Sequence, residues 1–212
     1  MIIALEGAPA VGKSTTAKYL AKEHGFYRVP EVNELFPTRP DPEPKDWYRA
    51  RQLERFEIAA ANQNSVLDGD PFQAIWFSWL YPGRGFADWS EVMAYFQAHA
   101  ESIPLPSFYG FLYIDSEVRY ERERGREMKR GHSHERFLQK WNRYADITGP
   151  HQAIFEAMAV EYPGWVVSLK TNDLPQVVNA LLNTQPPEPT DPRDFTMWLA
   201  SWLHANSPRN FR

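Results

Sequence analysis

The sequence predicts an α/β protein in three layers, with a five-stranded parallel sheet covered by helices on both faces. Two observations support this fold class. Five short apolar segments alternate along the chain with longer segments of helical pattern, as in a parallel sheet with crossover helices. The first apolar segment also runs directly into a glycine-rich loop that opens a helix, a unit typical of phosphate-binding α/β proteins.

The expected strands are short apolar runs without polar alternation, as strands buried on both faces should be. The first covers residues 2–5 and ends at Glu6 and Gly7. The third ends at Asp68-Gly69-Asp70-Pro71, a polar segment that favours a turn. We expect the strands at 2–5, 26–29, 65–67, 110–115 and 165–169.

The segments between the strands have the composition and spacing of helices. The first places Ala17, Leu20 and Ala21 on one face and is stopped by Gly25. A strongly charged helix follows the fourth strand. We expect helices at 13–24, 46–62, 72–80, 89–100, within 117–136, at 137–160 and at 174–182.

Proline divides the chain. Residues 37–44 contain four prolines and predict an extended loop, and residues 185–192 form a second, semi-rigid spacer. We therefore expect a main domain at 1–184 and an appendage at 185–212. The appendage ends in an amphipathic helix that should dock on its own domain or on a second copy of the chain as a homodimer. Its apolar face consists of Phe195, Trp198, Leu199, Trp202 and Leu203.

Composition narrows the class of protein. The chain has 212 residues, a formal net charge of −4 and no cysteine, which excludes disulfides and thiolate zinc sites. An acidic chain is a poor binder of nucleic-acid polymers, and no apolar run approaches the roughly 20 residues of a membrane span. We expect a cytoplasmic protein whose local basic segment at 117–136 serves a small anionic ligand.

The most specific motif is the segment 7–14, which fits G-x-x-x-x-G-K-[ST] at every fixed position. Glycines allow backbone N–H groups to surround phosphate oxygens, and the following helix N-terminus adds partial positive charge. Lys13 can then reach the terminal phosphates of ATP, and the Ser14 hydroxyl can bind Mg²⁺. We expect the nucleotide to contact Gly7, Ala8, Pro9, Ala10, Val11, Gly12, Lys13, Ser14 and Thr15.

Three segments resemble the deoxynucleoside kinase and thymidylate kinase family of P-loop NTPases: 5–16, 29–31 and 113–126. The resemblance implies a strand order of 2-3-1-4-5 and an ATP-dependent kinase. It also implies that Glu31 is the catalytic base, although the residue after it is Val32 where the family has proline. Glu34 is a rival for this role, as are two acids after the third strand.

Those two acids are Asp68 and Asp70. We expect Asp68 to hold Mg²⁺ through water and Asp70 to contact the phosphate acceptor. In the family, the acid at this place is followed by an arginine that touches the acceptor, whereas this chain has Gly69. The missing arginine favours an acceptor other than a standard nucleoside.

The charged segment 117–136 is predicted to be a lid over the nucleotide. It holds seven basic and five acidic residues. Arg122 and Arg126 share a helix face and could stabilise the transferring phosphate, and the resemblance adds Arg124 as a nucleotide contact. A solvated helix with Glu–Arg pairs is the alternative. His132 and His134 lack a third metal ligand and predict a flexible loop.

The acceptor is expected between the helix at 46–62 and the aromatic residues after the third strand. Gln52 resembles a base-reading glutamine of deoxynucleoside kinases, and Arg55 and Trp76 are further candidates. By topology, residues 171–173 should lie near the adenine. The remaining aromatic candidates are Trp47, Tyr48, Phe72 and Phe77.

The resulting hypothesis is an ATP-dependent kinase for a small acceptor, first a nucleoside or nucleotide. A kinase for an antibiotic or another hydroxyl compound is the alternative on the same fold, and a non-kinase ATPase module is the alternative from another class. A GTPase switch would need an Asn-Lys-x-Asp motif, and the chain contains no Asn-Lys pair.

Overall fold

The computed structural model describes residues 1–83, 86–144 and 147–211. All five strands are parallel and lie in the order β2-β3-β1-β4-β5, so the predicted fold class and strand order are confirmed. The strands differ from the predicted ranges by at most two residues at either end. They are β1 (Ile2–Glu6), β2 (Tyr27–Val29), β3 (Ser65–Asp68), β4 (Phe108–Tyr113) and β5 (Val166–Lys170).

The register of the sheet determines which residues meet at its carboxyl edge. Leu5 of β1 pairs with Asp68 of β3 on one side and with Gly110 of β4 on the other. The segments that follow these parallel strands therefore leave the sheet at the same edge, where ligands of open α/β sheets bind.

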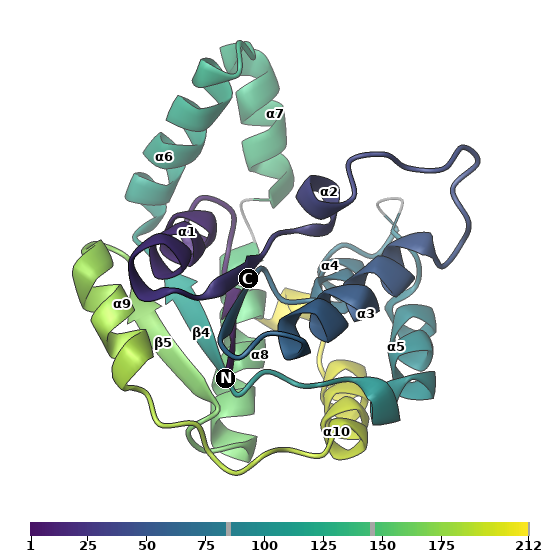
Figure 1. Ribbon diagram of the computed structural model, residues 1–212. Helices are drawn as coiled ribbons and strands as arrows, with labels where there is room; N and C mark the ends of the chain where they lie inside the picture. Colours follow the sequence, from purple (N-terminus) through teal and green to yellow (C-terminus); the bar gives the residue numbers. More distant parts are fainter. Residues whose placement is uncertain (84–85, 145–146, 212) are drawn as a thin grey trace.

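Helices cover both faces of the sheet (Figure 1). One layer contains α1 (Lys13–His24) and α9 (Leu174–Asn183), which contact each other. The other layer is larger, and its helices contact one another through α4 and α5. It consists of α3 (Trp47–Ala60), α4 (Gln73–Leu80), α5 (Trp89–Ala98), α8 (Thr148–Glu161) and α10 (Pro192–Ala205).

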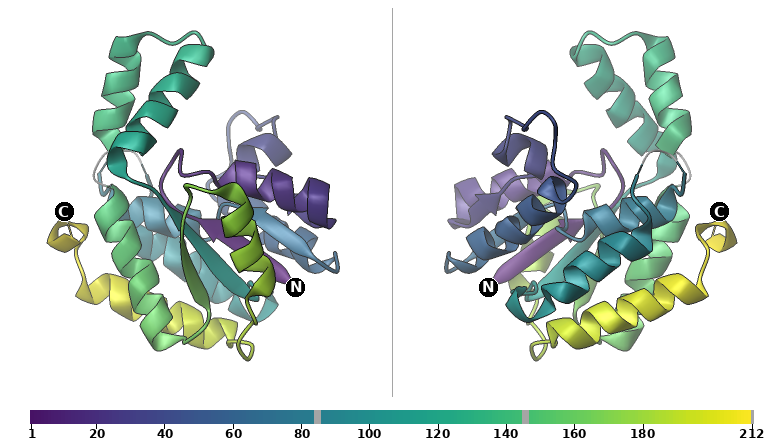
Figure 2. Two further views of the ribbon diagram at one scale, coloured as in Figure 1. Left: turned by 90° about the vertical axis from the view of Figure 1, so that its left-hand side faces the viewer. Right: turned by 90° about the vertical axis from the view of Figure 1, so that its right-hand side faces the viewer.

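The helices α6 (Ser116–Lys129) and α7 (His134–Tyr144) form a hairpin that projects beyond the carboxyl edge (Figures 1 and 2). The segment predicted to be helical at 137–160 is divided between two helices, α7 and α8, and its residues 145–146 lie outside the described residues. The two parts bury different faces. Phe137 and Trp141 of α7 pack on Tyr120 of α6, whereas α8 packs on β5. Pro150 lies in the first turn of α8, where proline is tolerated.

The C-terminal helix α10 docks on the body of the same chain. Phe195, Leu199 and Leu203 are buried, and the Phe195 ring centroid lies 4.9 Å from that of Trp165. The Trp79 indole N–H donates to the Leu203 carbonyl at 3.2 Å. Of the two docking modes that the sequence left open, the structure has the one within the chain. Three short helices complete the described fold: α2 (Val32–Leu35), η1 (Ala100–Ser102) and η3 (Pro208–Phe211).

Within the described ranges, no helix is both long and apolar enough to cross a membrane.

Candidate active site

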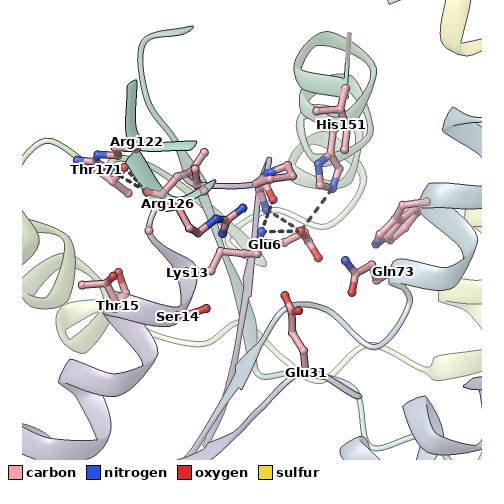
Figure 3. Close-up of a pocket in the computed structure, with 18 of the residues that line it drawn as sticks. Glu6, Lys13, Ser14, Thr15, Glu31, Gln73, Arg122, Arg126, His151 and Thr171 are labelled. Carbon is pink, nitrogen blue, oxygen red and sulfur yellow. Dashed lines mark hydrogen bonds and ion pairs between the residues drawn. The ribbon is translucent and has the colours of Figure 1, made fainter. Parts of the chain in front are cut away.

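A cavity of about 750 Å³ opens at the carboxyl edge of the sheet, a volume suited to a small-molecule ligand. Its walls come from segments far apart in the sequence: the loop after β1, the start of α2, the helices α4 and α8, the α6–α7 hairpin and the loop after β5. Figure 3 shows Glu6, Glu31, Gln73 and His151 on one side of the cavity and Arg122 and Arg126 on the other.

The loop between β1 and α1 has the backbone of an anion cradle. Gly7 and Gly12 have φ values of 140° and 115°, and Ala10 also has a positive φ, of 67°. Gly7 packs so closely on β4 that a Cβ atom there would lie 2.1 Å from the Leu112 carbonyl oxygen. Among the described residues, no side chain caps the start of α1. Its first N–H groups are therefore available to an anion.

Lys13 lies across this cradle. Its ammonium group donates to the carbonyl oxygens of Gly7 at 2.5 Å and Ala8 at 3.3 Å, and lies 3.9 Å from Glu6 Oε1. The side chain is only 11% exposed. Phosphate oxygens could replace the two carbonyl oxygens as its partners.

Glu6 connects the ends of β1 and β3. It is 2% exposed, and its two carboxylate oxygens accept hydrogen bonds from Gly7 N at 2.8 Å and Asp70 N at 3.0 Å. Burial raises the pKa of this carboxyl, an effect that Lys13 partly opposes. Glu6 was not among the predicted site residues, although an acid that ends a buried strand directly before the glycine-rich loop was a visible signal.

Ser14 and Asp68, the two residues expected to hold Mg²⁺, lie side by side. The Ser14 hydroxyl donates to Asp68 Oδ1 at 3.0 Å. A hydroxyl and a carboxylate are oxygen donors of the kind that Mg²⁺ prefers, and Mg²⁺ commonly takes its other ligands from water and phosphate. The donor set therefore fits this ion. In the part of the chain that the structure describes, no three His, Cys, Asp or Glu side chains form an all-protein metal site.

Arg28, which was not predicted, holds the other oxygen of Asp68 at 2.6 Å and also pairs with Glu34 at 2.7 Å. Its hydrogen bond to Glu34 lowers the pKa of that carboxyl. Glu34 is 56% exposed and does not line the cavity, so the geometry disfavours it as a rival base.

Glu31 lines the cavity just before α2. Burial is the main cause of its raised pKa, which the nearby Lys13 partly counteracts. Its side chain lies against Gly69, with Oε1 3.5 Å from the position that a Cβ atom would take there. Gly69 has a φ of 86°, so the residue at the family's arginine position has a conformation that favours glycine.

The α6–α7 hairpin brings cations to the cavity. Arg122 donates to the Thr171 carbonyl at 3.1 Å and to the Val11 carbonyl at 3.4 Å, and Arg126 pairs with Glu123. Both arginines line the cavity, as does Lys140 of α7. Arg124 instead pairs with Glu121, is 47% exposed and does not line the cavity.

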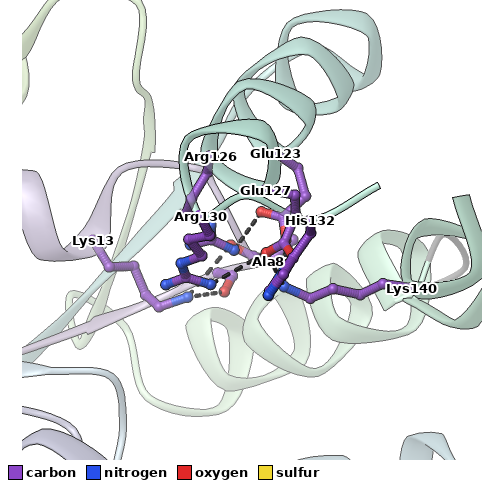
Figure 4. A network of polar contacts seen from close by, with 9 residues as sticks. Ala8, Lys13, Glu123, Arg126, Glu127, Arg130, His132 and Lys140 are labelled. Carbon is purple, nitrogen blue, oxygen red and sulfur yellow. Dashed lines mark hydrogen bonds and ion pairs between the residues drawn. The ribbon is translucent and has the colours of Figure 1, made fainter. Parts of the chain in front are cut away.

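Within the hairpin, two buried glutamates of α6, Glu123 and Glu127, form ion pairs with basic side chains of both helices (Figure 4). Lys140 reaches Glu123 at 2.7 Å and Glu127 at 2.8 Å. His132 Nδ1 lies 2.6 Å from Glu127, and these partners lower the pKa of Glu127 to about 2. His132 lies in the predicted loop, between α6 and α7, and is a structural partner of Glu127, whereas His134 already belongs to α7.

Three of the predicted acceptor residues lie behind the cavity wall. Arg55 is fully buried and donates to the Pro30, Asp68 and Gly69 carbonyls and to Gln52 Oε1. Asp70 is fully buried too and accepts from Trp76 Nε1 at 2.7 Å. Burial and the nearby Glu6 raise the pKa of Asp70 to about 7. A buried guanidinium must have its donors satisfied, which is why Arg55 donates to the backbone and to Gln52 instead of facing the cavity.

Of the predicted aromatic candidates, Trp76 and Phe77 line the cavity. Its lining also includes polar side chains that the sequence did not single out, among them Gln73, Lys140 and His151. Of the residues expected near the adenine, Thr171 and Asn172 line the cavity, whereas Asp173 caps α9. The Thr171 hydroxyl donates to the Val11 carbonyl at 2.5 Å and ties this loop to the anion cradle.

The chain's sequence matches no protein-family model and no curated protein sequence. Its fold resembles the deoxyadenosine kinase of M. mycoides with bound dATP, with a TM-score of 0.52 and 15% identity. That match covers 86% of this chain and 98% of the kinase. The same kinase with the products dCMP and dCDP matches with a TM-score of 0.52, 16% identity and coverage of 86% and 97%. The predicted likeness to the P-loop kinase fold is therefore confirmed at the level of the fold.

Proposed function

We propose that this protein is an ATP-dependent phosphotransferase that moves the γ-phosphate to a hydroxyl group of a small acceptor. A nucleoside or nucleotide is the first choice, and another hydroxyl compound, such as an antibiotic, is the alternative. One observation supports this most: the anion cradle at 7–14 and the carboxyl of Glu31 open onto one cavity. A triphosphate bound at the cradle and an acceptor beside Glu31 would therefore share this cavity.

Nucleotide binding follows from the loop. The backbone N–H groups of Ala8 and of residues 10–14 at the N-terminus of α1 would hold the phosphates, and the ammonium group of Lys13 would leave its two carbonyl partners for phosphate oxygens. Thr171 and Asn172 border the end where the base would lie. Ser14 and Asp68 would hold Mg²⁺, which neutralises charge on the β- and γ-phosphates when bound.

The transfer step needs a proton acceptor beside the attacking hydroxyl. The acceptor oxygen forms a bond to the γ-phosphorus as the bond from that phosphorus to the β,γ-bridging oxygen breaks, and ADP leaves with the bridging electrons. Glu31 takes the hydroxyl proton, and the raised pKa of its carboxyl makes it a better base than an ordinary glutamate. Arg122 and Arg126 can stabilise the charge on the transferring group.

The test compares Glu31→Gln with Glu34→Gln, two changes that remove the same charge three residues apart. We expect Glu31→Gln to lower acceptor-stimulated ATP consumption by roughly 10²–10⁴ while ATP affinity stays close to that of the wild type. Glu34→Gln should retain most of the activity, because Glu34 lies outside the cavity lining. Wild-type turnover in Glu31→Gln would remove the base from the proposal. ATP hydrolysis that no hydroxyl compound stimulates would favour an ATPase module.

A further inference from the structure

His151 of α8 has a buried ring with no hydrogen-bond partner among the described residues. The side chain is 4% exposed, and neither Nδ1 nor Nε2 is bonded. Aromatic rings flank it, with centroids at 5.6 Å for Phe111 and 5.3 Å for Phe155. Buried polar atoms of folded proteins are nearly always paired, so an unpaired ring that lines a cavity indicates a partner that comes from outside the chain.

The nearest acid does not serve as this partner. Glu6 Oε1 lies 3.8 Å from His151 Nε2, beyond hydrogen-bond distance, and already accepts from Gly7 N. Burial and the charge of Lys13 lower the pKa of His151 to about 3. The ring is therefore neutral at physiological pH and offers one donor and one acceptor, which matches the hydrogen-bonding capacity of a hydroxyl group.

Among the described residues, Lys13 is the cation whose charge affects the pKa of His151, and it lies across the anion cradle. The cavity's cationic lining residues in the described ranges belong to the anion cradle and the hairpin: Lys13, Arg122, Arg126 and Lys140. The opposite side presents the carboxamide of Gln73, the carboxyls of Glu6 and Glu31 and apolar surface from α4 (Figure 3). An anionic group there would meet two carboxyls, and Lys13, the cation beside Glu6, would already hold the phosphates of ATP, so the group would lose hydration without compensation.

Arg28 and Arg55 add no positive charge to the lining of the cavity. Arg55 is fully buried with its donors on three backbone carbonyls and Gln52, and Arg28 pairs with Asp68 and Glu34. Neither lines the cavity.

We propose that His151 binds a hydroxyl group of the acceptor, other than the one phosphorylated, and that the acceptor carries no phosphate on this side of the cavity. The proposal rests on the kinase function above and narrows it: His151 and Gln73 read neutral hydrogen-bonding groups, while Trp76 and the apolar residues of α4 cover the acceptor's less polar surface. A phosphorylated acceptor would need a second cation here, because Lys13 is taken up by the phosphates of ATP.

The experiment measures MgATP consumption with a panel of ribonucleosides, 2′-deoxyribonucleosides, their 5′-monophosphates and hydroxyl-bearing antibiotics. We expect one or more of the unphosphorylated compounds to stimulate ATP consumption. The rate of consumption with the matching 5′-monophosphate should be at least about tenfold lower. The variants are His151→Leu, which cannot form hydrogen bonds, and His151→Asn, which keeps a donor and an acceptor. His204→Leu, at an exposed position of α10, is the matched control.

His151→Leu should raise the KM for the acceptor about tenfold, as expected when a buried hydrogen bond is lost, while the KM for ATP changes less than twofold. His151→Asn should recover part of the loss. In wild-type protein with ¹⁵N-labelled histidine, the acceptor should shift the ring-nitrogen signal that is absent from His151→Asn. This second measurement does not depend on His151→Leu, so it tests the proposal even if that variant fails to fold.

The outcomes separate the two proposals. If the best compound is turned over but neither its KM in His151→Leu nor the His151 signal responds, the role of His151 is refuted and the kinase stands. Preference for a 5′-monophosphate likewise refutes the inference alone. If ATP binds but no compound stimulates its consumption, the kinase proposal fails and the inference fails with it.

Discussion

Gly7 is the residue at which the anion cradle is most tightly constrained. Its φ of 140° suits glycine, and an added Cβ atom would lie 2.1 Å from the Leu112 carbonyl oxygen. Leu112 belongs to β4, which pairs with strands on both sides, so the sheet cannot retreat. In Gly7→Ala the loop must therefore move away by roughly 1 Å to reach the shortest separation that real Cβ atoms show.

The expected cost has two parts. A backbone conformation unsuited to alanine costs about 1–3 kcal/mol, and overpacking against β4 costs about 1–3 kcal/mol, so the free energy of unfolding should fall by about 2–6 kcal/mol. The same displacement moves the amides that would hold phosphate, and a shift of this size can lower activity by about 10²-fold. Urea unfolding and calorimetric titration with MgATP measure both effects.

Gly125→Ala is the matched control for stability. Gly125 lies within α6 with no heavy atom within 4 Å of its added Cβ, so this change should raise the free energy of unfolding by about 0.5–1 kcal/mol. If Gly7→Ala had wild-type stability and wild-type ATP affinity, the close approach of the loop to β4 would not shape the nucleotide site, and our reasoning would be refuted.

Two further predictions concern the acids behind the cavity. Burial raises the pKa of Asp70 to about 7 in the folded protein, whereas its ordinary pKa, which applies to the unfolded chain, is 3.8. Since the folded state then binds more protons than the unfolded state, this group lowers the free energy of unfolding as the pH rises from 4 to 7, by at most about 1.4 kcal/mol per pH unit. Chemical unfolding across this range should show the decline in the wild type and a shallower one in Asp70→Asn; parallel curves would contradict it. Arg28→Met leaves the 1% exposed Asp68 without its cation and should cost roughly 3–5 kcal/mol in urea unfolding, whereas Arg39→Met, which breaks an exposed pair with Glu43, should cost less than about 1 kcal/mol. Equal losses in the two variants would refute the assignment.

The sequence predicts the sheet and the cradle well because both depend on local patterns. The strands are continuous apolar runs, and the loop at 7–14 has a fixed spacing of glycines, lysine and serine. Local patterns do not predict the division between α7 and α8. It depends on tertiary packing, because α7 packs on α6 whereas α8 packs on the sheet. The nearest feature in the sequence is Gly149-Pro150, which lies in the first turn of α8.

In the candidate site, too, local motifs were predictable and contacts that depend on tertiary packing were not. Arg55 looks like a ligand contact in the sequence, yet its donors are taken by carbonyls at the ends of β2 and β3. Gln73 and His151 carry no motif and reach the cavity only because α4 and α8 pack beside each other. Contacts of this kind depend on tertiary structure, so spacing along the chain does not predict them.

The most direct test of the account is a crystal structure with Mg²⁺ and a non-hydrolysable ATP analogue. We expect the β- and γ-phosphates against the backbone N–H groups of Ala8 and of residues 10–14, with Lys13 Nζ moved from the Gly7 carbonyl to a phosphate oxygen and the γ-phosphate facing Glu31. A nucleotide bound elsewhere, or Lys13 still bonded to Gly7 beside a bound triphosphate, would contradict the account.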